Sequence, residues 1–337
     1  MKRVVLAGGI SLVAAMPAQA LDPDVNLGGT FAASLSWFQD DNNINKTTDV
    51  DLENNGSNFR ITAAAQEGGI RAFMAYERGA SNDQLGVEDV REFFGGVSGW
   101  LGTALYGRKA TDYRQAGERL DPFYNTSVSG FNGQFASEGA SYGLSNLTNG
   151  YTSNTIAYHS PVWGGFDVNG AAFINDNNNQ GAGDKVDLGL GAGYANSDWL
   201  GLDTGVQYLD INGNVVTGSP AGDTEAYRVH GSIGENLWAV GVSYEIADVK
   251  AEADPRQYGF ASASYQLLEW MRVAVTYGHV SKSPSSDGDG GTLGAFYDIT
   301  NNLSTYTAVR YTKLDNGNQD ETVTVAGGVK FVFDVDL

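Results

Sequence analysis

The charged side chains with the clearest spacing are four arginines in the first third of the chain. Arg60, Arg71, Arg91 and Arg108 fall in separate stretches with the two-residue apolar alternation of β-strands. Around Arg60 the alternation places its apolar neighbours on one face and the guanidinium on the other. Glu92, next to Arg91, would share the apolar face, and this conflict predicts a strand end or a β-bulge there. Such fixed charges can orient dipolar solutes, but they do not by themselves make or break bonds.

Motifs for covalent chemistry or cofactor binding are incomplete in this sequence. His159 and Ser160 are adjacent in a predicted strand, so they point to opposite faces and cannot form a catalytic pair. The glycine run from Gly189 to Gly193 lies in an alternating strand with no helix after it, which argues against a nucleotide loop. Asp287-Gly-Asp289 completes no calcium motif, although the acidic loops leave room for a loosely bound divalent cation such as calcium. The sequence therefore predicts no enzyme and no tightly held cofactor.

The N-terminus has the three parts of a secretory signal peptide. Met1-Lys-Arg3 is positive, the run from Val4 to Met16 is mostly apolar, and Ala18-Gln-Ala20 is a small-residue cleavage site. We therefore assign residues 1–20 to a cleaved leader and residues 21–337 to one domain. Without the two basic residues of the leader, 18 basic and 40 acidic side chains give a net charge of −22. This acidity argues against nucleic-acid partners, and the absence of cysteine excludes disulfides.

Strand-like segments fill most of the mature chain, and no later apolar run reaches the length of about 18 residues that a membrane helix needs. About sixteen such segments are separated by short turns of Gly, Asn, Asp or Ser that alternate with longer acidic loops. Apolar and polar residues alternate within them, as from Trp238 to Ile246 and from Val329 to Leu337. We therefore predict an all-β, transmembrane antiparallel barrel, which spans lipid because it pairs its backbone groups internally. Tryptophans near the short turns fit an interfacial girdle.

One connection, from Lys109 to Tyr151, is much longer than the others. A loop of about forty residues without regular pattern is usually functional, and we expect it to fold into the barrel and narrow the interior. Motifs flank it: Phe94-Gly-Gly-Val-Ser-Gly-Trp-Leu-Gly-Thr-Ala-Leu-Tyr-Gly-Arg108 before it, and Asn154-Thr-Ile-Ala-Tyr-His-Ser-Pro161 with Gly165-Phe166 after it. They resemble the F-V-G-L-x-G-x-F-G-T-L-x-L-G-R and N-S-V-x-Y-x-S-P…G-F signatures of the general porins of Gram-negative outer membranes. In that family this segment is the third external loop and lines the narrowest part of the pore.

The resemblance implies a homotrimeric channel, embedded in outer-membrane lipid, for passive diffusion of ions and small hydrophilic solutes. It also implies that a basic wall faces acids on the long loop. The basic candidates are Arg60, Arg71, Arg91 and Arg108, and the acidic candidates are Glu118, Asp121 and Glu138. The overall acidity predicts a weak preference for cations.

Other interpretations stay open within and beyond this class. A substrate-selective porin would hold a binding site in the channel, marked by a ladder of aromatic or arginine side chains. A structural barrel with a plugged lumen would show no conductance. A barrel enzyme such as an outer-membrane phospholipase would need a Ser/His pair on the lipid face, and the sequence shows none.

Overall fold

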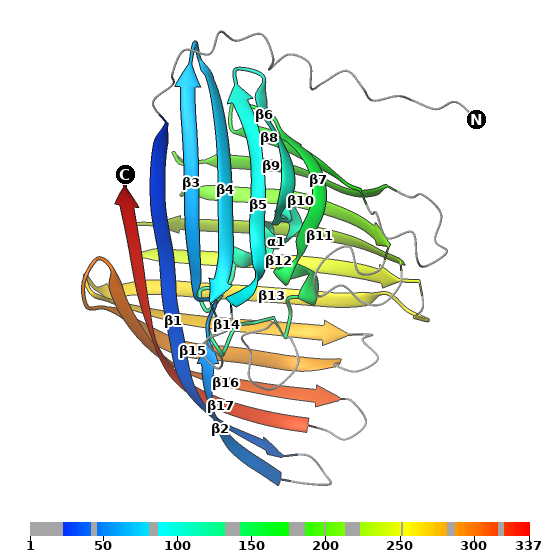
Figure 1. Ribbon diagram of the computed structural model, residues 1–337. Helices are drawn as coiled ribbons and strands as arrows, with labels where there is room; N and C mark the ends of the chain where they lie inside the picture. Colours follow the sequence, from blue (N-terminus) through cyan, green and yellow to red (C-terminus); the bar gives the residue numbers. More distant parts are fainter. Residues whose placement is uncertain are drawn as a thin grey trace.

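Strands make up most of the described chain, and Figure 1 shows them as one curved wall that closes on itself. This computed structural model describes residues 23–41, 46–80, 87–131, 142–174, 186–198, 200–212, 223–250, 252–281, 287–315 and 320–337. Neither described helix is long and apolar enough to cross a membrane. The proposed leader, residues 1–20, lies outside the described residues.

The first half of the wall comes from β1 Asp24–Asp41, β2 Lys46–Asn54, β3 Asn58–Glu67, β4 Ile70–Ala80, β5 Val87–Gly99, β6 Gly102–Ala110, β7 Tyr151–His159 and β8 Phe166–Phe173. The second half comes from β9 Asp187–Asn196, β10 Leu202–Asn212, β11 Asp223–Glu235, β12 Trp238–Val249, β13 Arg256–Leu268, β14 Met271–Ser281, β15 Asp287–Asp298, β16 Leu303–Asp315 and β17 Asp320–Asp336. The helical elements are α1 Asp112–Glu118 and the 3-10 turn η2 Asn146–Asn149.

The sheet closes where β1 pairs antiparallel with β17, from Asn26 opposite Asp336 to Asp41 opposite Glu321. On its other edge β1 pairs with β3 at one end and with β2 at the other. Because β2 and β3 share the same edge of β1, the seventeen strands fill sixteen positions in the wall. The predicted closed antiparallel barrel of about sixteen strands is confirmed, and closure satisfies the edges that an open sheet would leave unpaired.

The two-residue alternation decides which side chains face out, as the sequence predicted. On β12 the residues Val240, Val242 and Tyr244 are exposed, whereas Ser243 and Glu245 between and beside them are buried inside the barrel. β17 likewise exposes Val329, Phe331 and Val335 on its outer face. A wall with an apolar outside and a polar inside is what a lipid-embedded barrel requires.

Candidate functional site

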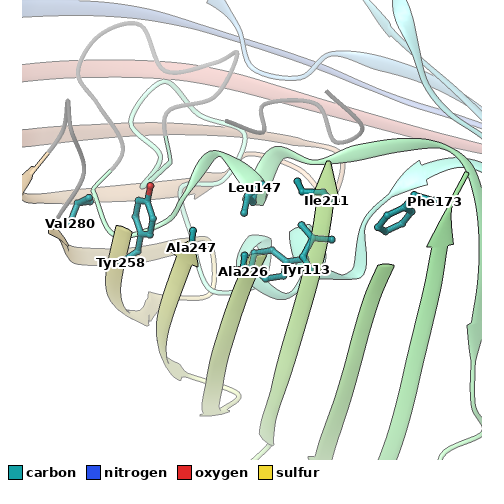
Figure 2. Close-up of a cluster of buried hydrophobic side chains, with 9 residues drawn as sticks. Tyr113, Leu147, Phe173, Ile211, Ala226, Ala247, Tyr258 and Val280 are labelled. Atoms are coloured by element: carbon teal, nitrogen blue, oxygen red, sulfur yellow. The ribbon is translucent and has the colours of Figure 1, made fainter. Parts of the chain in front are cut away.

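The described parts of the segment between β6 and β7, residues 111–131 and 142–150, lie against the inner face of the wall, and we call them the inner loop. Tyr113 from its first arm and Leu147 from its second arm belong to one buried cluster with inward-facing side chains of the strands (Figure 2). Those strand residues are Phe173, Leu209, Ile211, Ala226, Ala247, Tyr258 and Val280, from β8 and β10 to β14. Both arms therefore pack on the same side of the barrel.

The middle of the inner loop packs further along the same wall. Phe123 and Val128 are fully buried against residues of β14 to β17, among them Tyr306 and Ala326. The Tyr142 hydroxyl lies 2.8 Å from the Thr276 hydroxyl and 2.6 Å from that of Thr292. Burying a large apolar side chain contributes about 1.5–3 kcal/mol, so this packing holds the loop firmly on β8 to β17.

A buried ion pair ties both arms of the inner loop to the wall. Arg228 on β11 and Glu245 on β12 face each other in register, with Nη2 and Oε2 2.7 Å apart and both side chains almost completely buried. The Arg228 guanidinium also donates to the Tyr113 carbonyl and the Thr148 hydroxyl, each at 2.7 Å. Its remaining face covers the Tyr113 ring, with the guanidinium carbon 4.3 Å from the centroid. One guanidinium thus fixes the start of α1 and the end of the second arm, just before β7.

A cavity of about 620 Å³ remains between the inner loop and the opposite wall, β3 to β7, and we call it the charged cavity. Its floor on the loop side is α1, whose first turn is capped by the Thr111 hydroxyl accepting from the Arg114 backbone N–H at 3.0 Å. The cap and the Arg228 bond together orient α1, because they act on its first turn. The side chains of Arg114, Gln115 and Glu118 therefore face the cavity.

Both signs of charge occur on both sides of the charged cavity. Its lining includes four cationic side chains, Arg60, Arg91, Lys109 and Arg114, and three carboxylates, Glu77, Glu92 and Glu118. Arg60 lies 3.6 Å from Glu92 on the wall, and Arg114 lies 3.4 Å from Glu118 on the loop. The resemblance implied a basic wall opposite an acidic loop, whereas the described lining mixes the two. The charges nearly cancel, with one cationic group in excess among the described residues.

Arg60 and Arg91 both line the charged cavity. The register between β4 and β5 shifts at Glu77 and Arg78, so the predicted bulge at Arg91 and Glu92 is confirmed. Because of this bulge both adjacent side chains reach the cavity, and Nη1 of Arg91 donates to the Gly56 carbonyl at 3.0 Å. A regular strand would have sent one of the two to the outer face.

The other two arginines lie elsewhere, which corrects their expected place in the basic wall. Arg71 faces inward but sits beside the short turn between β3 and β4, six residues along the strand from Glu77, or about 20 Å. Arg108 pairs in register with Phe93, which is 56 % exposed on the outer face. Its guanidinium donates to the Val90 carbonyl and the Ser153 hydroxyl. The next residue, Lys109, has the inward parity and takes the cavity position.

The three acidic candidates do not share one location. Glu118 lines the charged cavity. Asp121 is buried within the inner loop, where its carboxylate accepts from the backbone N–H groups of Gly130 at 2.7 Å and Phe123 at 2.9 Å. Burial raises the pKa of Asp121 to about 6, against the opposing effect of these two N–H groups. Asp121 therefore organises the loop and does not line the charged cavity with Arg60 and Arg91. Glu138 lies outside the described residues.

Sequence reasoning missed Glu77, Lys109 and Arg114 as lining residues. Glu77 could have been found as the cross-strand partner of Arg60, and Lys109 by its parity with the inward Leu105. Arg114 carried no such signal, because its position depends on α1 and on the Tyr151 ring, which its guanidinium covers at 4.1 Å. His159 also lines the cavity, with its Nε2 3.5 Å from a carboxylate oxygen of Asp112.

Metal-binding groups do not gather in the part of the chain that the structure describes: no three His, Asp or Glu side chains there are placed to share an ion. A loosely bound divalent cation therefore stays a prediction from the acidic loops.

A closed barrel with an apolar outer wall and a charged passage beside a folded-in loop defines an outer-membrane channel. The family model of the Gram-negative porins matches residues 5–317, and the chain belongs to this family. Its place is thus the outer membrane, which it crosses many times as a β-barrel. No curated protein matches the sequence.

Solved porin structures share the fold at low sequence identity. An anion-selective porin from Comamonas acidovorans is 16 % identical with a TM-score of 0.74, covering 93 % of this chain and 100 % of its own. The trimer form of OmpT from Vibrio cholerae is 16 % identical with a TM-score of 0.66, covering 92 % and 99 %. OmpF of Salmonella typhi, in complex with daunomycin, is 15 % identical with a TM-score of 0.64, covering 92 % and 97 %.

Proposed function

We propose that the protein is a general diffusion porin, which passively conducts ions and small hydrophilic solutes with weak ion selectivity. The observation that carries this proposal is the charged cavity of about 620 Å³ between the inner loop and β3 to β7. Its polar, charged lining suits water and hydrophilic solutes, and apolar solutes would not recover the cost of displacing ordered water. The open volume of this cavity also argues against a lumen that the inner loop plugs completely.

Weak selectivity follows from the near balance of charges in that lining. The net charge of the chain predicted a mild cation preference, but the narrow section has four cationic and three anionic described side chains. Charges close to the permeating ion act more strongly than distant ones, which salt screens within about 8–10 Å. We therefore propose that neither cations nor anions are strongly favoured.

A homotrimer is the proposed assembly. Support comes from the trimer form of the similar OmpT structure and from the small outward side chains of β3 and β4. Ala63, Ala65 and Ala72 share the outer face with Ile61 and Met74. Small residues let backbones of neighbouring barrels approach closely.

Single-channel conductance of the purified protein in planar bilayers tests the proposal. We expect current steps in groups of three that rise nearly in proportion to salt, and a small reversal potential in a salt gradient. Absence of steps would instead indicate a plugged, structural barrel. A large reversal potential of either sign would contradict weak selectivity.

A further inference from the structure

A second cavity, of about 390 Å³, lies on the short-turn side of the inner loop. Loop residues from Arg119 to Pro122 cover it, and β11 to β14 form its wall close to the turns that join them. The Ser262 hydroxyl donates to the Leu120 carbonyl at 2.6 Å and so fixes the loop over this wall. The described linings of the two cavities share no residue. A solute in the second cavity would therefore contact a different set of side chains from one in the charged cavity.

Arg272 presents unused donors to the second cavity. Its guanidinium carbon lies 4.3 Å from the centroid of the Phe296 ring, which holds the side chain in place from one face. Within the described part of the chain, this guanidinium has no hydrogen bond and no carboxylate within 4.0 Å, although the Asp298 carboxylate on β15 is close enough to attract its charge. Stacking leaves the edge of a guanidinium, with its N–H groups, open to a ligand.

Other polar groups of the second cavity add to this donor set. The hydroxyls of Ser232 and Ser264 line it and likewise have no hydrogen-bond partner among the described residues. Arg119, on the loop, is 64 % exposed and lies 3.4 Å from Asp203. The lining carries one carboxylate, Glu235, against the two arginines. The described lining thus has two arginines against one carboxylate, with Asp203 beside Arg119 and Asp298 near Arg272 outside it, and at least three donor groups without a hydrogen bond among the described residues.

We propose that the second cavity is a subsite for small oxyanions, with Arg272 as the anchoring residue. A carboxylate or phosphate group matches the planar fork of a guanidinium, which can donate two parallel hydrogen bonds to it. Ser232 and Ser264 would donate to the remaining oxygens. The inference rests on the diffusion pore proposed above and adds a site within it that binds anions transiently. Glu235 limits the binding strength, as a site in a conducting channel needs, because a tightly held anion would block the passage.

Block of the chloride current by inorganic phosphate tests this subsite. Single channels are recorded in potassium chloride while phosphate, and separately acetate, is added at constant ionic strength. In the unmodified protein we expect the current to fall with added anion and to saturate. Arg272→Gln should weaken this block at least several-fold while leaving open channels in place. Arg71→Gln is the matched control, because Arg71 also faces inward near the short turns, 5.7 Å from the Phe73 ring, but outside the second cavity.

Each outcome bears on the proposal. Equal block in Arg272→Gln and in the unmodified protein would overturn it, and so would a conducting protein that neither anion affects. If no variant conducts, the diffusion pore itself is wrong and the subsite with it. Should Arg272→Gln fail to assemble, Arg119→Gln serves instead, because this exposed loop residue is not needed for the barrel and its loss should also weaken the block.

Discussion

Replacing Arg228 by Met should loosen the inner loop, because it removes a wall side chain that bonds both of its arms. The change deletes the donors to the Tyr113 carbonyl and the Thr148 hydroxyl, and it leaves the Glu245 carboxylate buried without its cation. Removing one partner of a buried ion pair costs about 3–5 kcal/mol. Glu245 keeps a bond from the Ser145 hydroxyl but has no cation beside it, so water must enter or the loop must shift.

The position of Tyr113 links this loss to conduction. Tyr113 directly precedes Arg114 and Gln115, which line the charged cavity from α1. We expect Arg228→Met channels to show larger open-current noise and additional conductance levels in planar bilayers. Heat denaturation, followed by the mobility shift of folded protein on gels, should show a lower transition temperature.

The double variant Arg228→Met with Glu245→Met provides the control. It removes both charges, and replacing a buried ion pair by apolar residues costs much less than breaking it. We therefore expect the double variant to recover most of the lost stability, but not the quiet current, because the bonds to Tyr113 and Thr148 stay absent. Equal stability of the single and double variants, or quiet currents in Arg228→Met, would refute this account of the ion pair.

Three further changes test other parts of the structure. Arg60→Glu turns the described excess of one positive charge in the charged cavity into one negative charge, so the reversal potential should move towards cation selectivity; an equal shift in Arg71→Glu, far from the cavity, would contradict this. Gly107→Ala should sharply reduce the yield of folded barrel, because φ is +143° and a Cβ would lie 2.2 Å from the Phe93 carbonyl oxygen. As a control, Gly68→Ala places its Cβ where nothing lies within 4 Å, and it should lower the free energy of unfolding by only about 1 kcal/mol. Burial raises the pKa of Asp121 from 3.8 to about 6, so the folded state binds the carboxyl proton more tightly than the unfolded state does. The free energy of unfolding should therefore fall, by up to about 3 kcal/mol, as the pH rises from about 4 to 6. Thermal transitions of Asp121→Asn should lack this fall.

The barrel could be predicted because the pattern that specifies it lies within short stretches of the sequence. A period of two in the apolar residues places one face of each strand in lipid, and alternate short and long connections order the strands around the wall. The residues from Trp238 to Ile246 already showed this pattern, and β12 has the faces that it predicts. The same counting placed Arg60 inside and exposed the conflict at Arg91 and Glu92, which the structure resolves with a bulge.

The charged cavity was only partly predictable, because its second side is a segment without a repeating pattern. Positions on the wall follow from parity, and the errors at Arg108 and Lys109 arose where parity was not applied up to the end of β6. Side chains of the inner loop have no such rule. Asp121 turned towards its own loop, whereas Arg114 reached the cavity.

The sequence by itself determined the closed β-barrel and the side of the wall on which most strand residues lie, since lipid and water impose a local alternation. Only the tertiary structure decided how the inner loop packs and which charges meet. Arg228 and Glu245 pair within one hairpin, but Tyr113, whose carbonyl Arg228 binds, lies 115 residues from Arg228 along the chain. Contacts of this kind depend on three-dimensional packing, and they set the charge balance of the passage and the place of Arg272 in the second cavity.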